Sequence, residues 1–200
     1  MSRILPTRLR LAVVAALAAA TTLAAGATDA SATDAAPAQA AAARFETFTS
    51  LNLGKNLTSN LTGNAVATTP QSTSTLQQWE RKTFLNIPNP PGGGFGAPYQ
   101  LRNRATQRCL QDVGNGSTVI ETTCQDSPSS TSPQLWHNHG AVDRTVNGKA
   151  YRFRFNRVSG RVLSVAPQFG TTVPVLSSPR ASNIGSAAAA LQLWTTTRIA

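Results

Sequence analysis

The sequence predicts an all-β domain built from three repeated units of about four short strands each. Three observations lead to this prediction: a Gln-x-Trp motif occurs three times, apolar and polar residues alternate with a period of two, and clusters of Gly, Asn, Ser and Pro separate the alternating segments. The chain has 200 residues, of which 13% are charged. These values fit one or two globular domains and exclude a large multidomain enzyme or a disordered polyelectrolyte.

The Gln-x-Trp motif contains every tryptophan of the protein. It occurs at Gln77 to Trp79, at Gln134 to Trp136 and at Gln192 to Trp194, so successive tryptophans lie 57 and 58 residues apart. We expect each tryptophan at an equivalent core position, because one large aromatic per repeat is typical of a core. The glutamine two positions earlier lies on the same face of its strand, where its amide can satisfy inward backbone groups.

A second marker precedes each motif. The segment Asn103 to Leu110 matches Asn156 to Leu163 at an offset of 53 residues, and Leu57 lies 53 residues before Leu110. Leu57, Leu110 and Leu163 therefore mark equivalent positions. Three units of this length fill the chain after its leader and leave no room for a second domain.

Within each unit the periodicity indicates strands. Aromatic residues and arginines alternate from Tyr151 to Phe155, and Tyr99 to Arg102 alternates in the same way. Turn-forming residues cluster at 88–96, 114–117 and 127–133. We therefore expect twelve strands, closed around a pseudo-threefold axis, and no helix longer than one turn.

The first 40 residues have the organisation of an export signal. Three arginines within the first ten residues precede an uncharged, alanine-rich run from Leu11 to about Thr28, and small-x-small cleavage sites follow at 30–32 and 38–40. The alternative is a membrane anchor, but alanine, threonine and glycine drive insertion weakly. We therefore predict a signal peptide and Ala-rich leader at 1–40, a secreted mature protein and no transmembrane segment after cleavage.

The two cysteines, Cys109 and Cys124, are too few for a disulfide scaffold or a four-ligand zinc site. Thiols of an exported protein meet oxidising conditions. Because the two residues are only fifteen positions apart, we predict that they form one intrachain disulfide.

The three Gln-x-Trp units, with Asn-x-x-[Ser/Thr]-x-Arg-x-Leu upstream of two of them, resemble the ricin B-type β-trefoil lectin domain. The resemblance covers residues 45–200, and the export signal is typical of a secreted bacterial member. It implies a β-trefoil fold and a carbohydrate-binding module. Trefoils also serve as hydrolase inhibitors and toxin-delivery subunits, so the fold alone leaves the function open.

The resemblance also implies where sugar would bind. A galactose site of this family needs an Asp just after the Cys-Leu pair, an aromatic ring two residues before the second Cys, and usually an Asn before Gln-x-Trp. The corresponding residues are Thr58, Thr69 and Leu76 in the first unit, Gln111 (with Asp112 one place late), Thr122 and Pro133 in the middle unit, and Ser164, Leu176 and Leu191 in the third. We therefore expect degenerate galactose sites without a stacking ring.

Asp112 and Asn115 are the remaining candidate sugar ligands in the middle unit. Their segment, Gln-Asp-Val-Gly-Asn-Gly, also has the composition of a turn before a strand. Both interpretations remain open from the sequence.

Catalysis is not expected. The few carboxylates do not pair at a telling spacing, and no nucleophile-elbow signature is present. His137 and His139 have the spacing of metal ligands on one strand face, but no third ligand is evident. We expect neither a metal nor another cofactor.

The net charge of +10 raises the question of a polyanionic partner. If Tyr151, Phe153 and Phe155 point into the core, Arg152 and Arg154 point outward, and Arg102 repeats this pattern one unit earlier. These arginines form either a basic face for phosphate or sulfated polysaccharide, or simply a solvated face. Three functions therefore remain: a glycan-binding module, a protein-binding trefoil, and a polyanion binder; nucleic acid is not expected.

Overall fold

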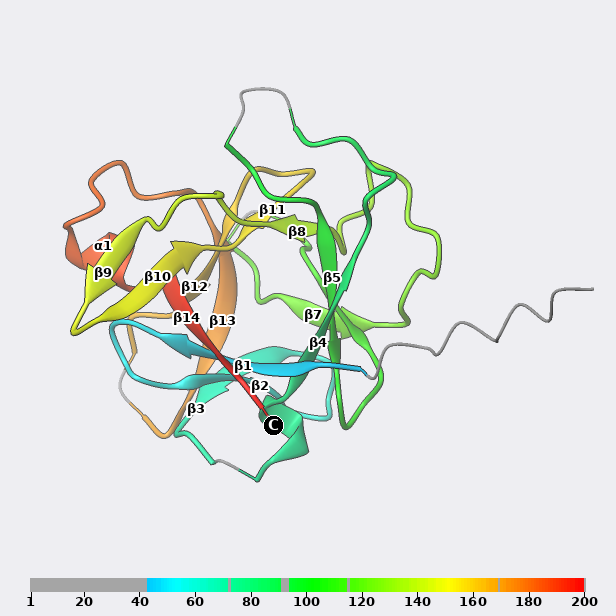
Figure 1. Ribbon diagram of the computed structural model, residues 1–200. Coiled ribbons are helices and arrows are strands. Elements are labelled where there is room, and N and C mark those ends of the chain that lie inside the picture. The colour runs from blue at the N-terminus through cyan, green and yellow to red at the C-terminus, as the bar shows by residue number, and fades with distance from the viewer. Residues whose placement is uncertain (1–42, 72, 91–93, 115, 169, 200) are drawn as a thin grey trace, which may run out of the picture. The chain divides into compact units, whose positions relative to one another are not determined.

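The computed structural model of the protein (Figure 1) describes five segments of the chain, which are 43–71, 73–90, 94–114, 116–168 and 170–199. The predicted signal peptide at 1–40 lies outside these segments. No helix within them is long and apolar enough to cross a bilayer.

The first two units have four strands each, as the repeat predicts. Those of the first unit are β1 (Phe45–Ser50), β2 (Asn56–Ser59), β3 (Ala65–Thr68) and β4 (Trp79–Thr83), with one 3-10 turn, η1 (Thr75–Gln77), before β4. Those of the middle unit are β5 (Tyr99–Asn103), β6 (Cys109–Gln111), β7 (Ile120–Thr122) and β8 (Trp136–His137).

The third unit has more strand segments than predicted, so the described residues form fourteen strands rather than twelve. Its elements are β9 (Arg144–Val146), β10 (Lys149–Phe153), β11 (Phe155–Asn156), β12 (Val162–Val165), β13 (Thr172–Ser178), α1 (Ala187–Ala190) and β14 (Leu193–Arg198). The extra strand β9 forms a hairpin with β10 that turns at Asn147 and Gly148, whose φ angles of 49° and 73° suit a two-residue hairpin turn. A break at Arg154 divides β10 from β11.

Six strand positions close into a barrel, with β10 and β11 together forming one of them. Strand β14 pairs with β1, β1 with β4, β4 with β5, β5 with β8 and β8 with β11, while β10, which directly precedes β11, pairs back to β14. The barrel thus joins the first and last strands of all three units, and it leaves no open sheet edge among these strands.

Three hairpins, β2–β3, β6–β7 and β12–β13, form a second layer. They contact one another through the pairing of β3 with β13 and through the isolated bridges Asn64 to Ile120 and Thr118 to Leu176. A barrel with a triplet of hairpins is the predicted β-trefoil, and Figure 1 shows β2–β3 beside β1.

The core confirms that the tryptophans occupy equivalent positions. All three are fully buried, and each indole Nε1 donates a 3.0 Å hydrogen bond to the backbone oxygen of a marker leucine. The pairs are Trp79 with Leu57, Trp136 with Leu110, and Trp194 with Leu163. The same contact therefore ties the barrel to the hairpin in every unit.

The expectation that Arg152 and Arg154 point outward is wrong for Arg154, which is buried, whereas Arg152 on the same face is partly exposed. Side chains do alternate along β10, but its aromatic face packs in a second core cluster with Leu193, and its arginine face turns into the barrel. Arg152 lies opposite Trp194 in the β10–β14 ladder, and directly opposed residues share one face of a sheet. Arg154 is only 2% exposed.

The repeat accounts for the burial of Arg154. At the offset of 53 residues, Arg154 corresponds to Leu101 and Leu101 to Phe48, both fully buried in the main core. The guanidinium of Arg154 lies over the Phe48 ring, with Cζ 5.2 Å from its centroid. Burial lowers the pKa of Arg154, nearby Arg81 lowers it further, and Tyr99 and Glu46 act in the opposite direction.

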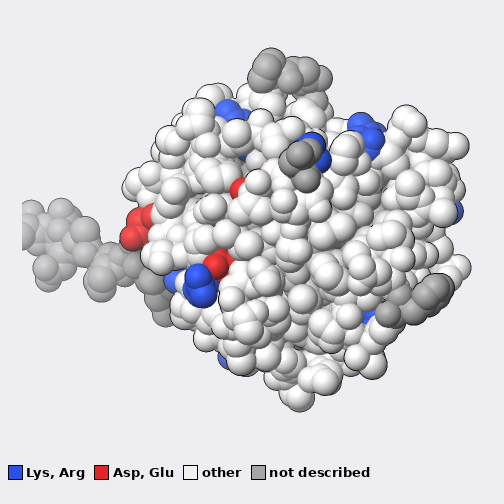
Figure 2. Space-filling view, turned by 180° about the vertical axis from the view of Figure 1, so that it is seen from behind, with Lys and Arg blue, Asp and Glu red and all other residues white. Residues whose placement is uncertain are grey.

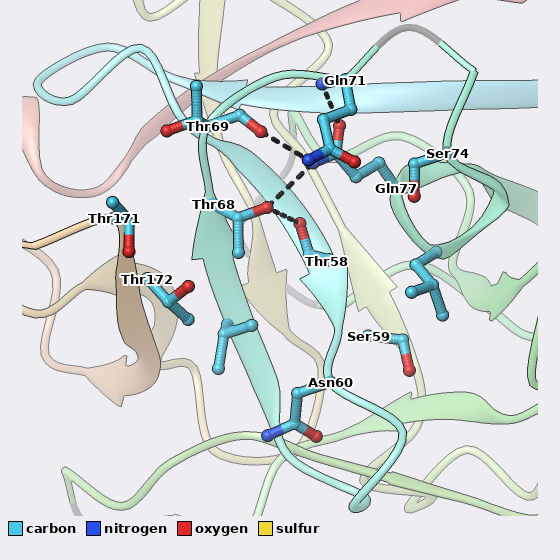
Figure 3. A pocket seen from close by; sticks show the side chains of 12 residues that line it. Thr58, Ser59, Asn60, Thr68, Thr69, Gln71, Ser74, Gln77, Thr171 and Thr172 are labelled. Carbon is cyan, nitrogen blue, oxygen red and sulfur yellow. Dashed lines mark hydrogen bonds between the residues drawn. The ribbon is translucent and has the colours of Figure 1, made fainter.

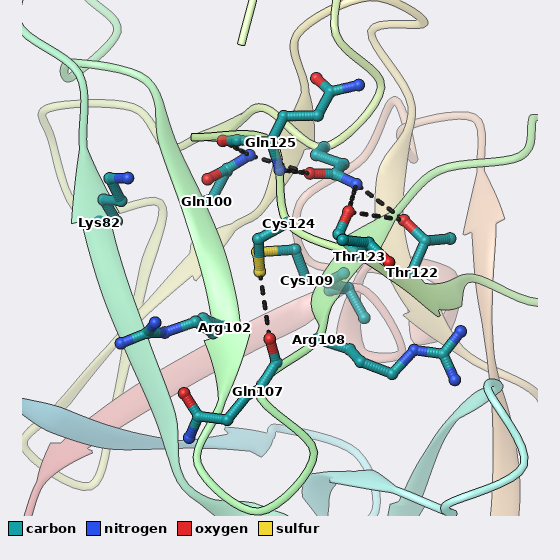
Figure 4. Close-up of a disulfide and its surroundings, with 12 residues drawn as sticks. Lys82, Gln100, Arg102, Gln107, Arg108, Cys109, Thr122, Thr123, Cys124 and Gln125 are labelled. Carbon is teal, nitrogen blue, oxygen red and sulfur yellow. Dashed lines mark hydrogen bonds between the residues drawn. A yellow bond between two sulfur atoms is a disulfide. The ribbon is translucent and has the colours of Figure 1, made fainter. Parts of the chain in front are cut away.

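Cys109 and Cys124 form the predicted disulfide. It joins the start of β6 to the residues that follow β7 and so fastens the middle hairpin (Figure 4). The four-residue helix α1 remains within the predicted single turn, and the Ser186 side chain caps it by accepting from Ala189 N.

Candidate functional site

The glutamine of each Gln-x-Trp motif holds the chain that leaves its hairpin. Its Oε1 accepts a hydrogen bond from a backbone N–H of that segment. Its Nε2 donates to the backbone oxygen of the residue two positions before the one that carries this N–H. The acceptor and donor residues are Thr69 and Gln71 for Gln77, Thr123 and Gln125 for Gln134, and Pro179 and Ala181 for Gln192. The interpretation that this amide satisfies backbone groups is confirmed in all three units.

The pairing of strands within each hairpin shows which residue occupies the position of the aromatic ring in the family's galactose site. Thr68 pairs with Asn56 in the first unit, Thr122 with Cys109 in the middle unit, and Ser178 with Val162 in the third. Thr122 is thus at the position expected from the sequence, whereas the expected Thr69 and Leu176 are one and two residues away from it. All three units have a hydroxyl rather than a ring there.

A hollow of about 530 Å³ opens beside the hairpin of the first unit (Figure 3). Ten of its twelve lining residues have a hydroxyl or an amide in the side chain, and none of them is charged. They are Thr58, Ser59, Asn60, Val66, Thr68, Thr69, Gln71, Ser74, Leu76, Gln77, Thr171 and Thr172. Thr58, Thr69 and Leu76 are the residues expected here from the sequence, whereas Thr171 and Thr172 come from the third unit and carry no motif that predicts them.

Several hydroxyls at the floor of the hollow are already oriented. The Oγ1 atoms of Thr58 and Thr68 share a 2.7 Å hydrogen bond, and Gln77 Nε2 donates to Thr68 Oγ1 at 2.8 Å (Figure 3). The side chains of Gln71 and Thr172, at the rim, are exposed. The arrangement offers hydrogen-bond donors and acceptors to a polyhydroxylated ligand.

The position equivalent to Thr58 has a longer side chain in the middle unit. Gln111 stands where the first unit has Thr58, and its longer side chain reaches across the hairpin, so that its Oε1 accepts from Thr122 Oγ1 at 3.1 Å. Gln134 Nε2 donates to the same Thr122 oxygen at 2.7 Å, as Figure 4 shows around Thr122 and Thr123. The polar groups here bond with one another.

Asp112 is buried, and both of its carboxylate oxygens accept hydrogen bonds within the protein. Oδ1 accepts from Gly114 N at 2.7 Å, the pattern of an Asx turn, and Oδ2 accepts from the hydroxyl of Ser159 in the third unit. This geometry supports a role in the turn. Asn115, the other candidate ligand, lies outside the described residues.

In the third unit, contacts between hairpins surround the predicted ligand positions. Ser164 is buried and donates to Val165 O, while Leu176 bridges to Thr118 of the middle unit. This position therefore contributes to the hairpin layer.

The comparison with protein families supports the lectin resemblance. Residues 75–175, half of the chain, match the model described as ricin-type beta-trefoil lectin domain-like. The chain belongs to this ricin-type β-trefoil lectin family. The family is one of carbohydrate-binding modules, and the match includes the middle unit together with the first and second Gln-x-Trp motifs.

Solved structures share the fold at low sequence identity. The designed threefold-symmetric protein ThreeFoil matches with a TM-score of 0.55 at 19% identity, over 78% of this chain and 99% of that one. The SDF2-like protein from Arabidopsis thaliana gives 0.56 at 12% identity, over 78% and 94%. An exo-beta-1,3-galactanase from Clostridium thermocellum gives 0.53 at 19% identity, over 79% and 30%. A search of curated proteins by sequence found no match.

Two of the three arginines predicted to form a basic face are not free at the surface. Arg154 is buried, and Arg102 is engaged with Glu80, to which its Nε donates at 2.8 Å. On the face shown in Figure 2, the Lys and Arg side chains lie in separate groups with uncharged atoms between them. The pattern on that face is typical of a solvated surface.

The two histidines after Trp136 pack against aromatic rings. His137 lies 4.3 Å from Phe95 between ring centroids, and His139 Nδ1 is 3.1 Å from Asp143 Oδ1. Burial, together with the nearby charges of Arg157 and His139, lowers the pKa of His137 to about 4. Within the part of the chain that the structure describes, no three His, Cys, Asp or Glu residues cluster as metal ligands.

A second hollow, of about 490 Å³, lies where β1, β10 and β14 meet. Thr47 and Thr197 face it from paired strands, and Lys149 and Tyr151 face it from β10. It differs from the first hollow in having an aromatic ring and a cation.

Proposed function

We propose that the protein is a secreted, non-catalytic lectin that binds a neutral glycan in the hollow of its first unit. The observation that supports this most directly is the hollow itself, which lies on the first Gln-x-Trp framework and is lined by hydroxyls and amides without a charged side chain. Neutral sugars are recognised through such groups.

The missing ring predicts weak binding of single sugars. A stacked aromatic contributes on the order of 1 kcal/mol beyond its buried area, and a millimolar dissociation constant corresponds to only about 4 kcal/mol in total. We therefore expect oligosaccharides, which contact more of the rim, to bind more tightly than monosaccharides. Two proteins that share the fold, the exo-beta-1,3-galactanase and an endo-beta-galactosidase from Clostridium perfringens, act on galactose-containing glycans, which makes such glycans suitable first probes.

The test is a glycan array followed by titration calorimetry with two matched variants. Gln71 and Gln125 are equivalent, because the backbone N–H of each donates to the glutamine of its motif. We expect Gln71→Ala to weaken binding about three- to tenfold, as for the loss of about 1 kcal/mol of hydrogen bonding, and Gln125→Ala to leave affinity unchanged. Equal effects of the two variants would contradict the proposed site.

Two further measurements separate the alternatives. Binding of a neutral glycan should change little between about 50 and 200 mM salt, whereas binding of a polyanion falls steeply. Lys149→Ala, at an exposed residue of the second hollow, should leave glycan affinity unchanged. If that variant abolished binding, the second hollow would be the sugar site and the proposal would be wrong.

The secreted location is a separate part of the proposal and rests on the order of basic, apolar and small residues at the N-terminus. Mass spectrometry of culture supernatant should find a mature N-terminus near residues 32–40. A cell-bound chain with its intact N-terminus would contradict export.

A further inference from the structure

The barrel interior contains cations where a trefoil core is expected to be apolar. Two sets of residues follow the offset of 53: Phe48, Leu101 and Arg154, and next to them Glu46, Tyr99 and Arg152. Each member of the second set lies opposite a motif tryptophan, since Glu46 pairs with Trp79, Tyr99 with Trp136, and Arg152 with Trp194. Both sets therefore surround the pseudo-threefold axis.

Buried donors in these layers have no partner among the described residues. They are Arg81 Nε, Arg152 Nε, Arg154 Nε and Tyr99 Oη. A buried polar group without a hydrogen bond typically costs about 1 to 3 kcal/mol, and more when it is charged. Four such groups in one region indicate that a group with several acceptor atoms belongs there.

The charges of the region point to the same conclusion. The guanidinium groups of Arg81 and Arg154 both interact with a single carboxylate, that of Glu46, which forms a salt bridge with Arg81. Arg81 also lies over the ring of Tyr99, with Cζ 5.0 Å from its centroid. Arg154 therefore shares its carboxylate with Arg81, and a buried cation whose charge is only partly balanced is unfavourable.

We propose that this end of the barrel binds an oxyanion, a sulfate, phosphate or carboxylate group, held by Arg154 and Arg152 and by the hydroxyl of Tyr99. A guanidinium donates two parallel hydrogen bonds to such a group, and a tetrahedral or planar oxyanion has enough acceptors for the remaining donors. The site is independent of the hollow in the first unit.

The test is the midpoint of thermal unfolding against sulfate or phosphate concentration, with ionic strength held constant by chloride. A ligand that binds only the folded state stabilises it by mass action, so the midpoint should rise by about 5 to 10 °C at a hundredfold excess over the dissociation constant. Arg154→Leu, which restores the residue type of Leu101, should unfold at a higher temperature than the native protein without the anion and should lose the specific response to it. The exposed-site control Arg108→Leu should keep the full response.

Sulfate also stabilises proteins generally, and that effect is common to all variants. Tyr99→Phe keeps the shape of the side chain and should retain the fold while reducing the response to sulfate. A larger response to glucuronate than to acetate would identify the anion as part of an acidic sugar, whereas equal responses would identify a free ion. Parallel sulfate curves for the native protein, Arg154→Leu and Tyr99→Phe would overturn the proposal.

Discussion

The hairpins of the first and middle units make the same framework contacts, yet they present different surfaces. Both are fixed by a tryptophan bonded to a leucine carbonyl and by a glutamine bonded to the departing chain. Thr58 and Gln111 each hydrogen-bond across the hairpin, to Thr68 and to Thr122, but a hollow opens beside the short Thr58 of the first unit. The two hairpins thus have similar hydrogen-bonded networks and differ in the length of the side chain at this one position.

This difference shows that framework and binding surface vary independently in this domain. The framework atoms are mostly backbone groups and the two motif residues, so the rest of each hairpin can change without loss of the fold. A lectin fold can therefore persist while the ring and the acid of its galactose site are absent.

The largest expected effect concerns the shared framework. Trp79→Ala and Trp136→Ala should each lower the free energy of unfolding by about 3 to 5 kcal/mol, because each removes a fully buried aromatic and its hydrogen bond. Urea denaturation of both variants measures this. If Trp136→Ala unfolded like the native protein while Trp79→Ala did not, the two frameworks would not be equivalent.

A smaller effect should be confined to the middle unit. The pKa of His137 is about 4 in the folded protein and near 6.5 when unfolded, so folding disfavours its protonated form. The associated stability is complete above about pH 6.5 and is lost as the pH falls toward 4, by about 2 to 3 kcal/mol. His137→Gln should flatten this part of the pH profile of unfolding; an unchanged profile would show that another group is responsible.

The smallest change in stability should come from exchanging the residues that distinguish the two hairpins. Gln111→Thr removes the hydrogen bonds that Gln111 Oε1 accepts from Thr122 and, at a longer distance, from Gln134, and should cost about 1 kcal/mol. Thr58→Gln should cost a similar amount, but it should abolish glycan binding by filling the first hollow. Calorimetric titration of both variants checks this, and full binding by Thr58→Gln would place the ligand elsewhere.

The sequence predicted the framework well because the framework depends on a repeat. The motif tryptophans, the marker leucines and the disulfide all lie where expected. The strand count was less accurate, since β9 has no counterpart in the other units and the break at Arg154 divides the strand equivalent to β5 into β10 and β11.

The error at Arg154 came from giving local alternation more weight than the repeat. Alternation between Tyr151 and Phe155 correctly separated two faces, but it could not say which face meets the barrel. The offset of 53 places Arg154 with Leu101 and Phe48, and this signal would have identified it as buried.

The candidate site was harder to predict than the fold. Thr58 was identified from its place in the unit, but Thr172 reaches the hollow only because β13 of the third unit pairs with β3 of the first. No motif marks such a contact between units, and the register that aligns Thr68 with Thr122 follows from pairing rather than from spacing.

The most direct test of the account is a titration of isotopically labelled protein with the best glycan of the array, followed by NMR at the backbone amides. We predict shifts at Thr58, Thr68 and Gln71 that saturate together, with the equivalent amides of Gln111, Thr122 and Gln125 unmoved. Saturating shifts at the middle-unit amides, with those of the first unit unmoved, would contradict the assignment of the glycan site.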